Sequence, residues 1–425
     1  MATDRPNIIF ILCDDLGPGD LGILWQNQRQ TKQKFATPQL DTFAQEGMIL
    51  SRHYCAAPVC APARGSLLTG RHQGHCGIRN SQFDKALPDE HTLGTVMRQA
   101  GYATAAFGKW GLQGGKYRLK WPGQRGDRSP ELEPGHPLLR GFDYFYGYTG
   151  HVDGHYHYPL KGNRPMYDGY KDVTDGLAKC YTTDLFTART KKWIVDHHKA
   201  HPKQPFFTYL GFDTPHAPQQ VPTTSHLTAK SNYPAGGGLT GGIQWNEGGK
   251  GGGNSGPHRG AKFSLYEGGL RIPAIISWPG HIPENQVRGQ FATGCDWYPT
   301  ILELCGISAT KHRLDGKSLT PIIKSADTPT AHKTFHWKLG SKLAVRQGKW
   351  KMVVTGKKIE LYDIPNDLGE AKNLAGKFPE VVTQLQQSNQ EYWQSITQKE
   401  DATESGKGEL DPGGPSPDRA TSSNK

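Results

Sequence analysis

The sequence predicts an α/β protein with a mixed, mainly parallel sheet flanked by helices, followed by a small C-terminal subdomain of antiparallel strands plus one helix. Three observations support this fold class. Apolar runs of strand length alternate with helical segments up to about residue 330. Beyond that point, short strands follow one another with glycines between them. Apolar residues make up 35% of the 425 positions and charged residues 21%, which excludes a wholly disordered chain and a coiled coil.

The first predicted element is a strand over residues 7–13, NIIFILC, a continuous apolar run rich in β-branched residues. Such a run is typical of a central strand that is buried on both faces. It ends in the carboxylate pair Asp14-Asp15. Because ligands bind at the carboxyl ends of strands in open α/β sheets, this pair is well placed for chemistry. The alternative is that the acidic pair only caps a helix.

The other elements of this sheet domain follow from the same signals. A helix is predicted to open at Thr37-Pro38, with Leu40, Phe43 and Ala44 on one face. A second helix over 92–100 is expected to end at Gly101. Further strands are predicted over residues 102–107, 205–213 and 272–278.

The last part of the chain predicts a separate small subdomain. Its short antiparallel strands are expected over residues 334–337, 342–355 and 359–362, with turns at Gly348 and Gly356-Lys357, and its helix over 379–398. The predicted domains are therefore an α/β domain over 1–330, an α+β subdomain over 331–399 and a disordered tail over 400–425.

Charge and cysteine content narrow the possible functions. The net charge is +11 with neutral histidines, but no dense Lys/Arg block is present, so no nucleic-acid partner is predicted. The excess of positive charge is consistent with an anionic substrate, or with surface charges that only keep the protein in solution. The longest apolar run is too short to cross a membrane, and the N-terminal residues lack a signal-peptide pattern, so we expect no membrane segment and, at face value, no export. The seven cysteines contain no CxxC pair and predict neither a disulfide scaffold nor a structural zinc motif.

The most informative motif is Cys60-Ala61-Pro62-Ala63-Arg64. Pro62 predicts the start of a helix that runs to Thr69, which places Cys60 at the positive end of that helix. Arg64 follows one turn later on the same face. A cationic environment of this kind suits a reactive cysteine, whereas a lone cysteine without it is more often a buried structural residue.

This motif resembles the C-x-P-x-R signature of the type I sulfatases, which have the alkaline-phosphatase-like fold. The resemblance extends over most of the chain, because several other segments match the family in the same order. They are residues 5–17 (RPNIIFILCDDLG), 107–110 (FGKW), 205–218 (PFFTYLGFDTPHAP), 259–273 (RGAKFSLYEGGLRIP) and 315–319 (DGKSL).

The resemblance implies a reaction centre built around Cys60. In the family this cysteine is converted to formylglycine by a maturation enzyme. One hydroxyl of the hydrated aldehyde attacks the sulfate ester, and the other expels sulfate by re-forming the aldehyde. Asp14, Asp15 and the modified Cys60 would hold Ca²⁺, or alternatively Mg²⁺, because both cations prefer hard oxygen ligands. Arg64 would hold the nucleophile and neutralise developing negative charge.

The same resemblance assigns the groups that bind substrate and protonate the leaving group. Lys109 and Lys262 would contact the sulfate oxygens, and His216 would protonate the leaving alkoxide. In the histidine-rich segment 151–159, His155 is the best match for a substrate-binding histidine and His157 is the second choice. Taken alone, each lysine would be a solvated surface residue and each histidine a loop residue.

Two departures from the family pattern bear on the site. Many members have a histidine two residues after the lysine, but this position is Gly111, so we expect His155 to take its place if its loop folds over the site. The family's Asp-Asn metal pair is also missing between His216 and Lys262, which are 46 positions apart. A stretch with 12 glycines in 26 residues, 235–260, occupies this interval and predicts an internal deletion. Asn246 and Glu247 are weak candidates to replace the missing pair.

The predicted function is therefore that of a sulfuric ester hydrolase acting on an aryl or carbohydrate sulfate. Its expected partners are a sulfated small molecule or glycan and a formylglycine-generating maturation enzyme. A phosphodiesterase or phosphonate-ester hydrolase is one alternative, because relatives with the same cysteine motif cleave phosphorus esters. A catalytically impaired binder of sulfated ligands is the other, because the Asp-Asn pair is missing.

Overall fold

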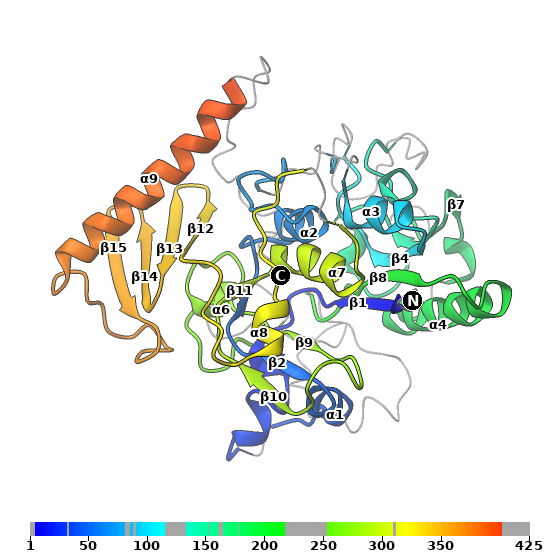
Figure 1. The fold of residues 1–425 in the computed structure, drawn as a ribbon, viewed down its shortest axis with the longest axis horizontal. Helices are drawn as coiled ribbons and strands as arrows, with labels where there is room; N and C mark the ends of the chain where they lie inside the picture. The colour runs from blue at the N-terminus through cyan, green and yellow to red at the C-terminus, as the bar shows by residue number, and fades with distance from the viewer. Residues whose placement is uncertain are drawn as a thin grey trace, which may run out of the picture. The chain divides into compact units, whose positions relative to one another are not determined.

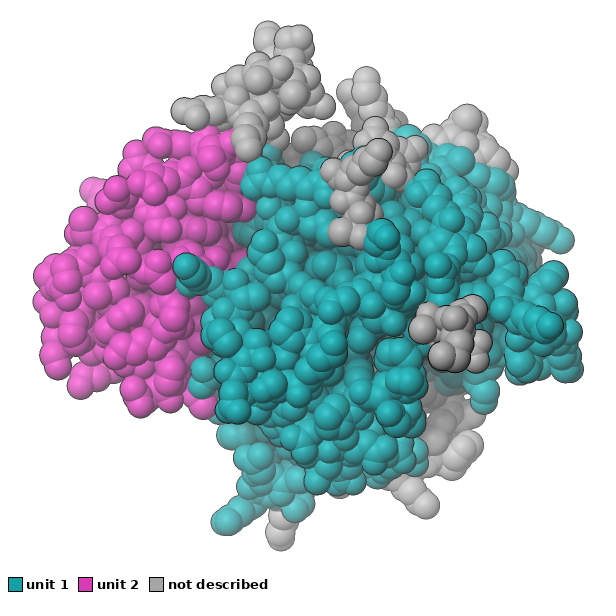
Figure 2. All heavy atoms as spheres, in the orientation of Figure 1, with its two compact units in different colours: residues 1–333 teal, residues 334–425 magenta. Residues whose placement is uncertain are grey.

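The computed structural model describes residues 5–31, 34–80, 86–87, 91–114, 133–151, 153–159, 165–177, 179–216, 253–308 and 312–401. The chain divides into two compact units, residues 1–333 and 334–425, which Figure 2 shows in different colours.

The first unit is organised around one main sheet (Figure 1). In spatial order, its strands among the described residues are β1 (Ile8–Leu12), β8 (Phe206–Gly211), β4 (Ala103–Lys109), β5 (Tyr144–Tyr148), β6 (Tyr167–Asp168) and β7 (Lys171–Asp172). The first four are parallel, and the two short strands continue the sheet in antiparallel pairing. This confirms the predicted mixed, mainly parallel sheet, and it brings the ends of β1, β8 and β4 to one edge.

Helices cover both faces of the main sheet. Successive side chains along β4 point to opposite faces, so each apolar cluster that they join lies on a different face of the sheet. Ala106 belongs to one apolar cluster, and its neighbours Ala105 and Phe107 belong to another. The first cluster contains side chains of α2 (Cys60–Thr69), α3 (Leu93–Gln99), α7 (Trp297–Leu304) and α8 (Thr320–Lys324). The second contains Phe186 of α4 (Thr182–Ala200), which packs on β4, β5 and β8.

The prediction of a buried central strand over 7–13 was wrong in one respect. The strand forms, but β1 lies at the edge of the main sheet, paired only with β8 among the described residues. Its alternate side chains Ile9 and Ile11 are 53% and 54% exposed. The apolar run identifies a strand that is suited to burial on both faces, but the composition of one strand does not specify which segments pack on it.

The predicted strand over 272–278 was also wrong. Only Ile275–Ile276 form a strand, β9, which pairs antiparallel with β2 (Met48–Leu50) in a separate small sheet. In that sheet β2 lies between β9 and β10 (Gln286–Arg288), and a further pair joins β3 (His53–Tyr54) to β11 (Ala292–Thr293). The prolines at 273 and 279 have no backbone N–H to donate, which limits how far this strand can extend.

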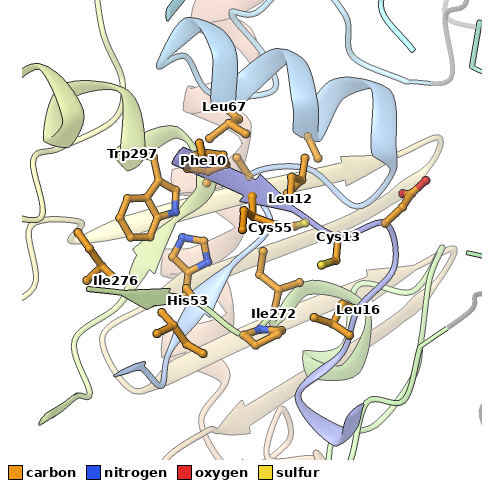
Figure 3. Close-up of a pocket in the computed structure, with 18 of the residues that line it drawn as sticks. Phe10, Leu12, Cys13, Leu16, His53, Cys55, Leu67, Ile272, Ile276 and Trp297 are labelled. Atoms are coloured by element: carbon orange, nitrogen blue, oxygen red, sulfur yellow. The ribbon is translucent and has the colours of Figure 1, made fainter. Parts of the chain in front are cut away.

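A cavity of about 740 Å³ lies between β1 and the segment 271–279, and we call it the β1 groove. Figure 3 shows Phe10 and Leu12 of β1 on one side of this space and Ile272 and Ile276 on the other. Ile9 and Ile11 also line the groove. So do Leu40 and Phe43 of α1 (Pro38–Gln45), whose exposed fractions are 41% and 42%. They were predicted to share one helix face with Ala44, which is buried. The exposed apolar side chains of β1 and α1 are therefore gathered at one place.

The second unit is a four-stranded antiparallel sheet with one long helix, as predicted. Its strands are β12 (Thr334–Leu339), β13 (Lys342–Gln347), β14 (Trp350–Thr355) and β15 (Lys358–Asp363), in that order, and its helix is α9 (Pro379–Asp401). Gly348 divides the predicted segment 342–355 into two strands, because its positive φ of 56° closes the turn between them. Leu385 of the helix packs against Val345 and Leu361 of the sheet. The disordered tail was predicted over 400–425, but α9 continues through residues 400 and 401, and residues 402–425 lie outside the described residues.

The first unit is expected to lose stability in mild acid, because it contains three buried histidines whose pKa values are lowered. Burial lowers the pKa of His53, His91 and His136 to about 4. In the unfolded chain these groups titrate at about 6.5, so the unfolded state binds more protons as the pH falls from 6.5 toward 4. Stability is therefore fully present above pH 6.5, and by pH 5.5 the three groups together cost about 4 kcal/mol. Thermal unfolding at pH 7.5, 6.5 and 5.5 measures this loss.

The matched control for this prediction is His53→Leu, because the imidazole is buried and lines the apolar β1 groove, where a leucine side chain of similar size can pack. We expect the acid-induced loss of unfolding free energy to be smaller in the variant by about 1.4 kcal/mol at pH 5.5. The same loss in both proteins would show that His53 does not contribute.

Candidate active site

The site begins where β1 ends, at Asp14 and Asp15. The backbone N–H of Asp14 donates to the carbonyl of Thr214 at 2.9 Å, which connects this loop to the one that follows β8. Asp15 has a left-handed backbone with φ of 66°, a conformation that aspartate tolerates better than most residues and that is often found at functional sites. The two carboxylates thus point into the site from adjacent positions with different backbone conformations.

Cys60 is the first residue of α2, as its predicted place at the helix start requires. Arg64 follows one turn later, is 2% exposed and lies 3.7 Å from the carboxylate of Asp14. One of its Nη atoms donates to the carbonyl of Lys109 at 2.7 Å and to the Tyr209 hydroxyl at 3.2 Å. This guanidinium therefore connects α2 to the ends of β4 and β8.

Lys109 ends β4 and is completely buried. Its ammonium group donates to Oδ2 of Asp14, forming an ion pair that neutralises two buried charges. Gly154 packs against its aliphatic stem, because a Cβ at that position would approach Cγ of Lys109 within 2.6 Å. The lysine is thus held in place by a carboxylate and by the histidine-rich loop.

His216 and Lys262 come together although 46 positions separate them in the sequence. The Lys262 ammonium donates to Oδ2 of Asp15 at 3.0 Å and to Nε2 of His216. Nε2 of His216 lies 3.5 Å from the same carboxylate oxygen. Phe263, directly after the lysine, has a φ of 67°, so backbone strain occurs on this side of the site as well.

The histidine-rich loop folds over the site, as expected for a substitute of the histidine that is missing at Gly111. The rings of His155 and His216 stack with their centroids 3.8 Å apart. The ring of His157 instead lies near Tyr181, and its Nε2 bonds to the backbone carbonyl of Asp213 at 3.1 Å. His155 therefore lies in the site beside His216. His157 instead contacts the backbone of the loop that follows β8.

His151 also reaches the site, although it was not predicted as a site residue from the sequence. Its Nε2 lies 3.1 Å from Sγ of Cys60, and the residue is 4% exposed. Its ring meets that of His155 edge to face at 5.0 Å. The spacing of these two histidines, four positions apart in the same loop, was the available signal, but only the fold shows that both approach position 60.

The pKa values of Asp14 and Lys262 are shifted in the direction that favours their charged forms. Burial alone would raise the pKa of Asp14, but Lys109, His216, Arg64 and Lys262 outweigh it and hold that pKa well below its usual range. Burial also opposes charge on Lys262, yet neighbouring carboxylates raise its pKa above the usual value.

The pKa values of the site histidines are shifted in the direction that favours their neutral forms. Burial, followed by the Lys262 ammonium, lowers the pKa of His216 to about 4. Burial and Lys109 lower the pKa of His151 and of His155 well below the ordinary value. At neutral pH Lys262 therefore carries a proton, and these three imidazoles are neutral.

The oxygen atoms at this edge suit a hard cation. The two carboxylates of Asp14 and Asp15 are the kind of ligand that Ca²⁺ and Mg²⁺ prefer, and both lie near position 60. In this structure each accepts from a lysine ammonium, which balances the carboxylate charge. Asn246 and Glu247, the candidates for further ligands, lie outside the described residues, as do residues 235–252 of the glycine-rich stretch 235–260 that predicts the deletion. All seven cysteines are free thiols.

Comparison with known structures defines the class of protein. The chain superimposes on the structure titled Ps i-CgsB with a TM-score of 0.74 and 24% identity, over 92% of this chain and 93% of the other. It also superimposes on a putative sulfatase from Bacteroides fragilis with a TM-score of 0.69 and 18% identity, over 93% and 97% of the two chains. The fold is therefore the predicted alkaline-phosphatase-like α/β fold.

The chain belongs to the sulfatase family. The sequence model of that family, described as Sulfatase, matches residues 6–239, and the C-terminal model of N-sulphoglucosamine sulphohydrolase matches residues 260–396. N-acetylgalactosamine-6-sulfatase of Sus scrofa is 30% identical over 400 residues, which cover 82% of this chain and 72% of that protein. Arylsulfatase G of Mus musculus is 31% identical over 395 residues, which cover 75% and 69%. These relatives confirm the predicted sulfatase class of enzyme.

A membrane-spanning helix was not expected from the sequence. Within the described part of the chain, no helix combines the length and the apolar character needed to cross a bilayer.

Proposed function

We propose that the protein cleaves the sulfate ester of a sulfated carbohydrate or aryl alcohol with a formylglycine made from Cys60 and a divalent cation. The observation that carries this proposal is the convergence at one sheet edge of Cys60 with two ion pairs, Asp14–Lys109 and Asp15–Lys262. The lysine of each pair places a positive charge where an anionic substrate group would approach residue 60. The aspartate of each pair places a carboxylate where a divalent cation would bind.

The residues of the chain take distinct roles in this proposal. Asp14, Asp15 and modified residue 60 would hold Ca²⁺ or Mg²⁺, which supplies positive charge that activates the nucleophilic oxygen and stabilises the sulfate oxygens. Arg64 orients the start of α2 through its bond to the Lys109 carbonyl. Lys109 places a second cation beside the sulfate position, where charge develops in the transition state.

The pair formed by Lys262 and His216 is suited to protonate the leaving oxygen. The proton resides on Nζ of Lys262, which hydrogen-bonds to Nε2 of the neutral His216. Bound sulfate adds negative charge next to this pair, which favours the protonated imidazole. His155 stacks on His216 and restricts its orientation toward the substrate.

Two solved relatives support a sulfated glycan as the substrate class. One structure of Ps i-CgsB is described as a complex with k-i-k-neocarrahexaose, and its TM-score with this chain is 0.73 at 24% identity. Another relative is described as a complex with its substrate D-glucosamine-2-N,6-O-disulfate, with a TM-score of 0.66 at 17% identity. The net charge of +11 also favours an anionic substrate.

The experiment that tests the proposed reaction compares two ester types. The chain is co-expressed with a formylglycine-generating enzyme, and turnover is measured on p-nitrophenyl sulfate and on bis(p-nitrophenyl) phosphate. We expect a higher kcat/KM for the sulfate. Preference for the phosphodiester would favour the phosphorus-ester alternative, whose fold-level support is a phosphonate monoester hydrolase of Agrobacterium radiobacter with a TM-score of 0.57. Stoichiometric binding of sulfated glycan without turnover would favour the impaired binder.

Removing the proton donor should affect poor leaving groups most. His216→Ala and Lys262→Met are expected to lower kcat/KM for a sugar sulfate by about 10²–10⁴-fold. The loss for p-nitrophenyl sulfate should be smaller, since nitrophenolate leaves without protonation. Turnover of the two substrates by wild type and both variants measures the difference. Equal losses for both substrates would contradict the role in protonation and indicate a role in sulfate binding.

A further inference from the structure

We infer that, before Cys60 is modified, its thiol forms a transition-metal site with His151 and His155 that binds Zn²⁺. Among the described residues, Sγ of Cys60 and one ring nitrogen from each histidine lie within 4.8 Å of one another. This ligand set is chemically different from the oxygen-rich site proposed for the modified enzyme, and the inference does not depend on sulfatase activity.

The geometry is close to that of a three-ligand zinc centre. Zn²⁺ forms bonds of about 2.0–2.3 Å with histidine nitrogen and cysteine sulfur, so its tetrahedral ligand atoms lie roughly 3.5 Å apart. Sγ of Cys60 and Nε2 of His151 are already 3.1 Å apart. Small side-chain rotations by His155 close the set, and water takes the fourth position, as in zinc sites with three protein ligands.

A second observation points to a ligand at this place. Nε2 of His155 is buried and has no hydrogen-bond partner, although a buried polar nitrogen without a partner is costly. His155 enters the cluster from the loop that packs over Lys109, whereas Cys60 enters from the start of α2. An ion bound between them would satisfy the nitrogen and connect the loop to the helix.

The surrounding charges allow this ion. Lys109 and Lys262 are each paired with a carboxylate, Asp14 and Asp15 respectively. Neutral imidazole and thiolate are the ligands that suit Zn²⁺, whereas the carboxylates beside them suit Ca²⁺ or Mg²⁺. Conversion of Cys60 to an oxygen-bearing side chain would therefore remove the Zn²⁺ site.

The test uses the full chain expressed without a maturation enzyme, so that residue 60 remains a thiol. Co²⁺ is titrated into the reduced protein, and absorption is recorded in the near-ultraviolet and visible range. We expect one equivalent to produce a sulfur-to-cobalt charge-transfer band together with the visible bands of four-coordinate Co²⁺, and Zn²⁺ to remove both. Cys60→Ala should lose the charge-transfer band, and His155→Gln should weaken binding at least about tenfold. Cys180→Ala is the matched control and should behave as wild type.

A second measurement does not depend on the variants folding. Zn²⁺ should slow iodoacetamide alkylation of Cys60 in the wild-type chain, and Cys180 in the same molecules should react at an unchanged rate. Tryptic peptides separate Cys60 from Cys180, and fragment ions distinguish Cys60 from Cys55, which lies in the same peptide. A charge-transfer band that persists in Cys60→Ala, or alkylation of Cys60 that Zn²⁺ does not slow, would overturn the inference. Either result leaves the sulfatase proposal untouched, because that reaction uses the modified residue.

Discussion

Cys60→Ala is expected to lower aryl-sulfate turnover by at least about 10³-fold in protein co-expressed with a maturation enzyme, because the substitution removes the nucleophile. The fold should be retained. Cys60 is the first residue of α2 and is partly exposed, so removal of Sγ leaves little void and should cost less than about 1 kcal/mol of unfolding free energy. Steady-state turnover and thermal unfolding of the two proteins measure these effects separately.

Cys180→Ala serves as the control for this prediction. Cys180 lies two residues before the start of α4 and has no place in the proposed machinery, so this variant should keep wild-type turnover. If Cys60→Ala retained turnover equal to that of Cys180→Ala, a different group would have to act as nucleophile.

The second large effect concerns the β1 groove. We expect insertion between His216 and Lys262 of a helix and a strand that ends in an Asp-Asn pair, the segment that the resemblance to the family implies is missing, to raise aryl-sulfate turnover by about 100-fold or more. We also expect the protein with the insert to bind Ca²⁺ more tightly and to unfold at a higher temperature. Turnover, Ca²⁺ titration and thermal unfolding of the two proteins measure these changes.

The structure supplies two physical reasons for this expectation. Among the described residues, β1 has a paired neighbour on one side only, and Ile9 and Ile11 are more than half exposed beside a cavity of about 740 Å³. A strand in that space would add ladder hydrogen bonds and bury apolar surface. Ca²⁺ takes six to eight oxygen ligands, whereas Asp14, Asp15 and residue 60 provide three positions. A strand that ends in an Asp-Asn pair beside Asp14 would supply more.

A matched control separates the two reasons. The same insert with Ala-Ala in place of Asp-Asn should raise the unfolding temperature but leave Ca²⁺ affinity and turnover near those of the 425-residue chain. Tight Ca²⁺ binding and full turnover by the chain without any insert would contradict the prediction. In that case Asn246, Glu247 or other residues of the chain would complete the site.

The sequence allowed much of the site to be predicted, because its motifs are local. The proline two positions after Cys60 indicates where the helix starts, and helical spacing then places Arg64 on the same face. Strand composition likewise identified β1, β4 and β8, whose parallel arrangement brings Asp14, Lys109 and the loop of His216 to one edge.

Other features depend on contacts between distant segments, which composition does not encode. The edge position of β1 depends on which segments pair with it, so the apolar run over 7–13 was misread as central. The run over 272–278 was misread for the same reason, since β9 pairs with β2 instead of the main sheet. His151 was missed because its approach to Cys60 arises only when the loop folds over the helix.

The central claim is that converted residue 60 carries the activity, and peptide mass measurement tests it most directly. Trypsin releases residues 53–64, HYCAAPVCAPAR, which contain both Cys55 and Cys60. Conversion replaces the sulfur and two hydrogens of Cys60 with one oxygen, and Cys55 remains as an internal thiol reference. Preparations with different levels of maturation enzyme should show specific activity proportional to the converted fraction and no activity at zero conversion. Full aryl-sulfate turnover by protein that retains both thiols would contradict the account.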